Sequence, residues 1–83
     1  MKLAKHVKFR EEKFGSVLFE TRSEKVYTLN PTATAVVREI QAGSDERSIP
    51  GKLKERFNDT GGAIEREAAA FIVELRLKGL VED

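Results

Sequence analysis

The chain has 83 residues, with 15 Lys or Arg, 14 Asp or Glu, one His and no Cys. Its length fits one small domain, here taken as residues 1–83. A content of 40% hydrophobic and 35% charged residues is typical of a globular chain rather than a disordered or membrane protein. The absence of Cys excludes disulfides, zinc–thiolate sites, iron–sulfur ligation and thiol nucleophiles. Residues 1–13 lack the apolar centre of a secretory signal, so we expect a cytoplasmic protein.

The first thirty residues predict three short strands. Residues 6–10 alternate apolar with polar, while residues 16–21 and 25–29 are rich in β-branched and aromatic side chains. The polar stretches between them are long enough for hairpin turns and too short for helical crossovers. The sequence therefore predicts a three-stranded antiparallel sheet.

Three helices are expected after this sheet. Asn30 and Pro31 are typical of a helix start, and this first helix is expected to end at Gly43. A second helix is predicted to be capped by Ser48 and to bury Ile49, Leu53 and Phe57, and the third covers residues 64–78. The predicted fold class is α+β, with a three-stranded antiparallel N-terminal sheet followed by three helices in a winged-helix-like arrangement.

The third predicted helix has two apolar faces. On a helical wheel, one face is a core stripe of Ile64, Ala68, Phe71, Ile72 and Leu75. The other is a strip of Ala69, Ala70, Val73 and Leu77, flanked by Arg66 and Arg76. This strip is either ordinary exposed surface or the contact for the sheet, a sister subunit or a ligand. The flanking arginines favour an extended acidic peptide.

Catalytic machinery is sparse in this sequence. His6 is the only imidazole and is near the N-terminus, and no metal-ligand spacing, Walker loop or dinucleotide fingerprint occurs. Asp45, Asp59 and Asp83 fall in loops or at the end, where Asp commonly caps a helix or stays solvated. We therefore expect a protein that is not an enzyme and holds no cofactor or metal.

Nucleic-acid binding is the main alternative, because a sheet with three helices is shared with winged-helix proteins. Residues 1–30 carry a net charge of +3, whereas residues 31–83, which contain the helices, carry −2 and so oppose approach to DNA. The outward residues of the last helix include Glu65, Glu67 and Glu74, where a recognition helix would present cationic or amide side chains. These features argue against a nucleic-acid partner.

An ordered set of short segments resembles the PqqD family, the peptide chaperones of pyrroloquinoline quinone biosynthesis and related peptide-recognition elements. The resemblance covers about residues 14–81. Its segments are Leu29-Asn30-Pro31-Thr32-Ala33, Ala42-Gly43, Ser48-Ile49, Leu53, Phe71-Ile72, Leu75 and Gly79-Leu80-Val81.

This resemblance implies a three-stranded sheet on a winged-helix-like trio of helices, and a non-catalytic chaperone. Such a chaperone binds the leader of a ribosomally made precursor peptide (RiPP) by strand addition and presents it to a radical S-adenosylmethionine (SAM) enzyme. By carry-over, the third strand would supply the binding edge with Val26, Tyr27, Thr28 and Leu29. The groove wall would comprise Arg66, Ala69, Ala70, Val73, Arg76 and Leu77.

Two departures from the family pattern concern the last helix. Glu67 stands where the family commonly has Asp, and Val73 and Leu77 are more apolar than usual. The leader sequence is therefore left open. A DNA-binding winged helix and a homodimeric interaction module that uses the apolar strip on itself stay as alternatives.

Overall fold

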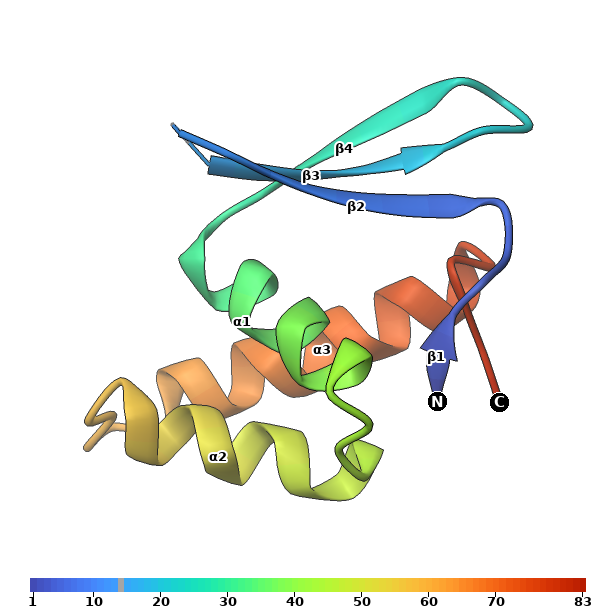
Figure 1. Cartoon of the computed structure of the whole chain (residues 1–83). Coiled ribbons are helices and arrows are strands. Elements are labelled where there is room, and N and C mark those ends of the chain that lie inside the picture. Colours follow the sequence, from blue (N-terminus) through green and yellow to red (C-terminus); the bar gives the residue numbers. More distant parts are fainter. Residues whose placement is uncertain (14) are drawn as a thin grey trace.

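The main sheet lies over a layer of helices (Figure 1). The structure, a computed structural model, describes residues 1–13 and 15–83. The sheet has the antiparallel order β2-β3-β4 and is followed by three helices, which confirms the predicted α+β class. The bounds are β2 (Val7–Glu12), β3 (Gly15–Glu20), β4 (Lys25–Leu29), α1 (Pro31–Gln41), the 3-10 turn η1 (Glu46–Ser48), α2 (Ile49–Arg56) and α3 (Ala63–Leu77).

A second sheet was not predicted. Near the two ends of the chain, β1 (Lys2–Leu3) pairs antiparallel with β5 (Val81–Glu82), so the fold has a two-stranded and a three-stranded sheet. Strands of two residues are too short to show an alternating pattern. Their pairing depends on tertiary contacts, such as the hydrogen bond from the Ala4 N–H to the Leu80 carbonyl (3.0 Å).

The main sheet buries one face against the helices. Val7, Leu18 and Leu29 are buried, as the pleat of a half-buried sheet requires. They join helix residues in one core, whose fully buried larger side chains also include Val36, Val37, Ile40, Ile49, Leu53, Leu75 and Leu80. The helical layer is thereby fixed against the sheet.

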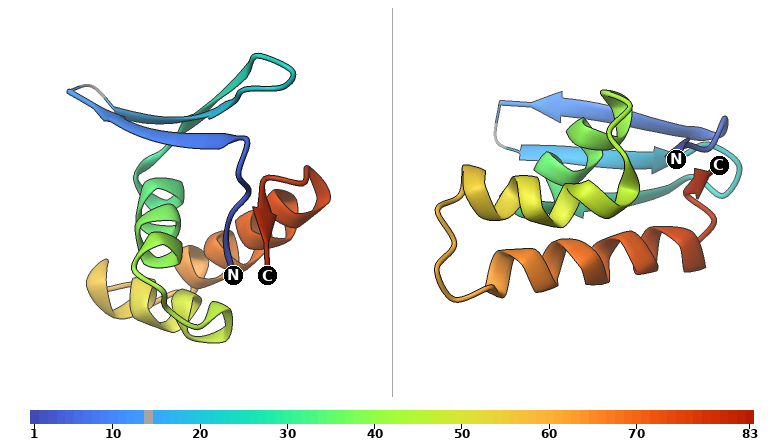
Figure 2. Two further views of the ribbon diagram at one scale, coloured as in Figure 1. Left: turned by 45° about the vertical axis from the view of Figure 1, so that its right-hand side comes forward. Right: turned by 90° about the horizontal axis from the view of Figure 1, so that it is seen from below.

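The first helix is buried more widely than the predicted stripe. Asn30 caps it as expected, since its Oδ1 accepts a hydrogen bond from the Ala33 N–H at 2.8 Å. Thr32 and Thr34 are buried as well, because α1 lies between the sheet and the other two helices (Figure 2). The Thr34 hydroxyl is satisfied there by a hydrogen bond to the hydroxyl of Ser16 in β3.

The start and end of α2 differ from the prediction in detail. Ser48 precedes the helix, but its hydroxyl donates to the Asp45 carbonyl (2.7 Å) and makes no capping bond, because η1 already provides the entry turn. Phe57 was expected to be buried and is 38% exposed. Since α2 ends at Arg56, Phe57 no longer follows the helical spacing that buries Ile49 and Leu53.

The last helix is fixed at both ends. The Asp59 carboxylate accepts hydrogen bonds from the N–H groups of Ile64 (2.9 Å) and Glu65 (3.2 Å). Burial alone would raise the pKa of Asp59, but these amide donors outweigh it and hold that pKa below its ordinary value. Gly79 ends the helix with a φ of +69°, a conformation that favours glycine. Over residues 1–13 and 15–83, the structure contains no helix long and apolar enough to cross a lipid bilayer.

Candidate functional site

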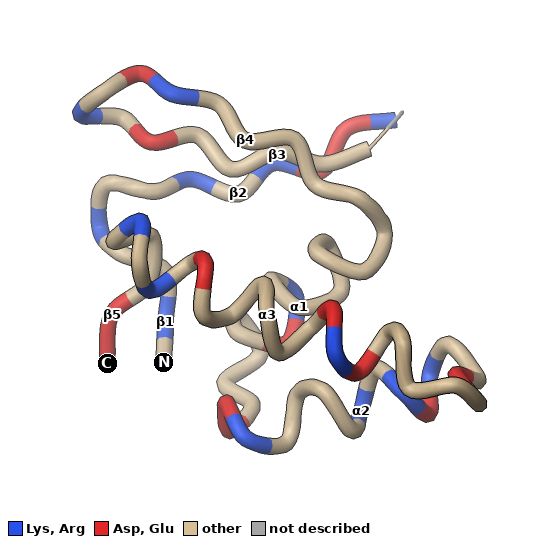
Figure 3. Tube along the Cα trace, turned by 180° about the vertical axis from the view of Figure 1, so that it is seen from behind, with Lys and Arg blue, Asp and Glu red and all other residues tan. Residues whose placement is uncertain are grey.

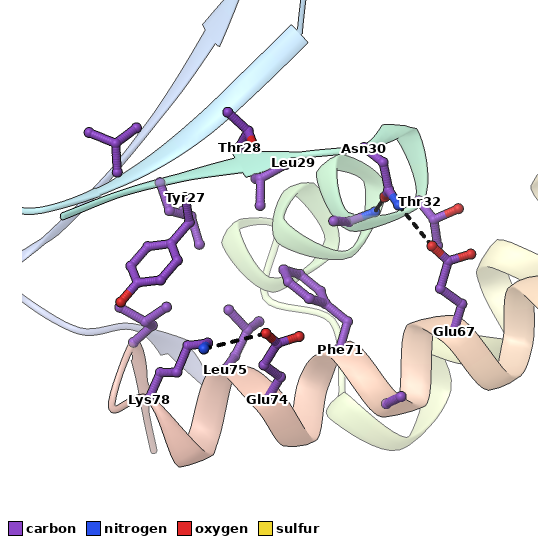
Figure 4. A pocket seen from close by; sticks show the side chains of 15 residues that line it. Tyr27, Thr28, Leu29, Asn30, Thr32, Glu67, Phe71, Glu74, Leu75 and Lys78 are labelled. Carbon is purple, nitrogen blue, oxygen red and sulfur yellow. Dashed lines mark hydrogen bonds and ion pairs between the residues drawn. The ribbon is translucent and has the colours of Figure 1, made fainter.

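An open cavity of about 530 Å³ lies between β4, the start of α1 and α3 (Figure 4). Its floor is apolar and its rim carries charged side chains. The lining residues are Leu18, Val26, Tyr27, Thr28, Leu29, Asn30, Thr32, Ala33, Glu67, Ala70, Phe71, Glu74, Leu75, Lys78 and Leu80. We call this cavity the β4–α3 groove.

The main chain of β4 forms one side of this groove and has an unpaired edge, because among residues 1–13 and 15–83 β4 pairs only with β3. The hydrogen bond from the Thr21 N–H to the His6 carbonyl (2.8 Å) fixes which residues of β3 direct their main-chain groups toward β2. Successive residues of an antiparallel strand direct these groups to opposite sides, so the residues in between face β4. By that alternation, Tyr27 and Leu29 bond to β3. The N–H and C=O groups of Val26 and Thr28 therefore face the open edge.

The side chains of β4 alternate between the two faces of the sheet. Figure 4 shows Tyr27 and Leu29 on the helix side of the strand and Thr28 on the other side. Leu29 is buried and Tyr27 half-buried, whereas Val26 is 57% exposed. Val26 and Thr28 thus border the groove with their main chain, while Tyr27 and Leu29 border it with their side chains.

The opposite wall comes from one row of α3. Phe71 is half-buried and Leu75 is buried, and they form the apolar centre. At one end, Glu67 Oε1 accepts a hydrogen bond from Asn30 Nδ2 at 2.9 Å (Figure 4). Nearer the other end, Lys78 Nζ lies 3.5 Å from Glu74 Oε1.

Lys78 lies at the end of the groove that is next to Tyr27. Its Nζ lies 5.6 Å from the centre of the Tyr27 ring, within the range of a cation–π contact. The groove therefore has an apolar middle, an acidic end at Glu67 and a mixed-charge end at Lys78.

Half of the residues predicted for the site line the groove, namely Val26, Tyr27, Thr28, Leu29 and Ala70. The structure places Arg66, Ala69, Val73, Arg76 and Leu77 outside the groove lining. The row that faces the groove lies about a third of a turn around α3 from the predicted strip.

The two arginines of the predicted strip are engaged elsewhere. Arg76 Nη2 lies 2.6 Å from Glu46 Oε2 in η1 and 3.4 Å from Asp83 Oδ1. The hydrogen bonds to Glu46 raise the pKa of Arg76. Arg66 Nη1 donates to the Gly61 carbonyl at 3.4 Å. The observation that favoured an acidic peptide therefore does not apply to this groove.

The predicted apolar strip faces solvent. Val73 is 55% and Leu77 83% exposed, and neither contributes to the groove. Because both side chains are exposed, they do not pack against the sheet, which was one of the neighbours considered for them.

Sequence reasoning missed the other ten residues that line the groove. Five of these are buried, and the five that are exposed or half-buried are Asn30, Glu67, Phe71, Glu74 and Lys78. Asn30 was interpreted only as a cap and Phe71 only as core. The four helix residues recur every three or four positions, so a search for the row beside the core stripe would have found them.

The other edge of the sheet is a poorer template for an added strand. β2 is also an edge strand, but it carries Lys8, Arg10, Glu11 and Glu12, and charged edges discourage strand pairing. Beside it is a second hollow of about 500 Å³, where the Arg38 guanidinium is paired with the Glu11 carboxylate. The β4 edge is the more favourable one.

No metal centre is formed by the described residues: outside position 14, no group of three or more His, Asp or Glu side chains is placed to hold an ion. The features above define a class of protein, a small α+β domain with an open strand edge beside a helix-walled groove. The chain belongs to the PqqD family, since the family model for coenzyme PQQ synthesis protein D (PqqD) matches residues 15–81.

Two solved structures share this fold. One is TbiB1 in complex with the TbiA(beta) leader peptide, with a TM-score of 0.82 and 18% sequence identity over 99% of this chain and 95% of that chain. The other is lasso peptide synthetase B1 complexed with the leader peptide, with a TM-score of 0.81 and 23% identity over 99% of this chain and 96% of that chain. No curated protein sequence matches the chain significantly.

Proposed function

We propose that this protein is a non-catalytic chaperone that binds the leader of a ribosomally made precursor peptide as an added strand on β4 and presents it to a radical SAM enzyme. The observation that carries the proposal is the open edge of β4 beside the β4–α3 groove. Membership of the PqqD family supports it, as do the leader peptides bound to the two proteins of similar fold.

In strand addition, the main chain of β4 would provide affinity and the side chains of the groove would provide selectivity. The outward N–H and C=O groups of Val26 and Thr28 would bond to any extended chain, largely irrespective of its sequence. Every second side chain of the added strand would then point toward α3, where the half-buried Phe71 offers apolar contact. The groove would thereby distinguish a leader from other extended peptides.

The chemistry would belong to the partner enzyme. A radical SAM enzyme uses an iron–sulfur cluster, which Cys thiolates usually hold, and this chain has no Cys. The protein would contribute only by raising the local concentration and fixing the position of the bound peptide.

Thr28→Pro tests strand addition directly. Because the Thr28 N–H faces the open edge, Pro there removes a donor needed by an added strand and leaves the bonds between β3 and β4 in place. We expect binding of a leader peptide to be lost while the fold is kept, as judged by circular dichroism. The leader is best taken from a precursor gene beside the gene for this protein.

Thr28→Ala is the matched control, since it removes the same side chain and keeps the N–H group. NMR titration of the wild type should shift the amides of Val26 and Thr28 most. Leader binding by Thr28→Pro at wild-type affinity, or shifts confined to residues 52–56 of α2, would refute strand addition on β4.

A second candidate function is self-association through the outer face of α3. It is favoured by the exposure of Val73 and Leu77, an apolar pair that the groove does not use. Analytical ultracentrifugation tests it, because a dimer built on this face should dissociate in Leu77→Lys. DNA binding by a winged-helix-like arrangement gains no such support, since basic and acidic segments are interspersed over the whole trace (Figure 3).

A further inference from the structure

The β4–α3 groove has two chemically different ends, which gives it a direction. Glu67 lies at the end where β4 runs into α1, and Lys78 lies at the end beside Tyr27 (Figure 4). Phe71 lies between them. A bound strand would therefore meet different chemistry along its length.

The length of the groove fits a small number of side chains. From Glu67 to Lys78, α3 advances about 16 Å at 1.5 Å per residue. Alternate residues of a strand are about 7 Å apart, so about three inward side chains of an added strand fit along this wall. One would lie near Glu67, one over Phe71 and one near Lys78.

The charges at the two ends are not equally compensated. Lys78 forms an ion pair with Glu74 and lies over the Tyr27 ring. The hydrogen-bond partner of Glu67 is the neutral amide of Asn30, and no ion pair within residues 1–13 and 15–83 includes Glu67. The uncompensated charge of the groove is thus one carboxylate at the Asn30 end.

No arginine of α3 offsets that carboxylate. Arg76 is held by Glu46 and Asp83 on another side of the helix. Arg66 bonds to the Gly61 carbonyl and does not line the groove. An acidic side chain near Glu67 would meet repulsion, whereas a cation there would gain an ion pair.

We infer that Glu67 determines specificity, and that the groove selects an extended peptide with a Lys or Arg at the Glu67 end and an apolar side chain two residues away, over Phe71. This rests on the proposed function, because it requires a strand added to β4. The alternation of the strand sets the spacing of two, and the separation of Glu67 from Phe71 by one helical turn suits it.

A peptide scan on the full chain tests this specificity. The probes are synthetic peptides of about ten residues, acetylated and amidated, on a Thr, Val and Ser host in which one position at a time is Lys, Gln or Glu. For the wild type we expect one position at which Lys binds about twofold to fivefold more tightly than Gln, the size of an ion pair that stays partly in water. Glu at that position should bind more weakly than Gln.

Two substitutions at Glu67 connect the preference to this side chain. Glu67→Gln keeps an acceptor for Asn30 and should remove the preference, and Glu67→Lys should reverse it in favour of Glu. Glu65→Gln is the matched control, since it removes the same charge from the same helix outside the groove lining. It should keep the wild-type preference for Lys.

The failures of the two proposals are distinguishable. Peptides that shift the Val26 and Thr28 amides with no charge preference, or with one unchanged in Glu67→Lys, would overturn the role of Glu67 and leave strand addition intact. If the leader shifts these amides and no peptide of the set does, only the specificity fails. If neither the leader nor any peptide of the set shifts them, strand addition fails and the specificity fails with it.

Discussion

Truncation of two leucines on α3, two residues apart, should separate the core of the protein from its surface. Leu75 is 1% exposed, in the centre of the packed helices, whereas Leu77 is 83% exposed. Leu75→Ala should cost about 2–5 kcal/mol, because it removes buried surface and leaves a cavity. Leu77→Ala should stay within about 0.5 kcal/mol, as surface changes usually do.

The expected loss at Leu75 is large for a chain of this size. A domain of 83 residues has a free energy of unfolding of roughly 4–12 kcal/mol. Each 1 kcal/mol shifts the melting temperature of such a domain by about 4–8 °C, so Leu75→Ala should melt at least 8 °C lower, or be unfolded at room temperature.

Urea unfolding followed by circular dichroism measures both variants, with Val73→Ala as a second surface control. The wild-type slope should be kept in Leu77→Ala. Equal destabilisation at Leu75 and Leu77 would show that the outer strip of α3 is part of a packed interface, and the assignment of Leu77 to free surface would be wrong.

Two further predictions concern charge. The pKa of Glu39 lies below its ordinary value of 4.5. The hydrogen bond from the Ser44 hydroxyl lowers it most, and the cations Arg56 and Lys52 lower it further, whereas burial alone would raise it. The ionised Glu39 therefore stabilises the contact between α1 and α2 fully above pH 4.5, and this stabilisation is lost as the pH falls through the folded-state pKa. In Glu39→Gln, the free energy of unfolding should fall less steeply with decreasing pH in this acid range. Secondly, peptide affinity should fall modestly with salt, whereas tight duplex DNA binding with a slope of several charges would contradict the proposed function.

The elements with strong local signals were predicted closely from the sequence. The predicted strand over residues 25–29 matches β4, and the helix predicted to follow Ser48 and to bury Ile49 and Leu53 corresponds to α2, because alternation and apolar spacing act within each segment. The pairing of β1 with β5 depends on contacts between the two ends of the chain, and the exposure of Phe57 depends on where α2 ends. No local pattern carries that information.

The groove was predicted only in part, for a related reason. The family resemblance implied residues 26–29 as the binding edge, and all four line the groove; their role in peptide binding stays a prediction. A helical wheel gives relative angles but not which angle faces the sheet. The exposed residues Val73 and Leu77 were therefore predicted to form the groove wall. Phe71 was assigned wholly to the core, although it also lines the groove.

The pairing of β1 with β5 brings the two ends of the chain to one place, away from β4 (Figures 1 and 2). Lys2 and Glu82 are register partners there, with Nζ and Oε1 3.9 Å apart. A chain that enters and leaves at one point can be inserted into a loop of another protein, or closed by a short linker and reopened elsewhere. The domain is thus suited to circular permutation, and new ends opened in the turn after β3 would give a direct measure of how far β4 depends on its hairpin.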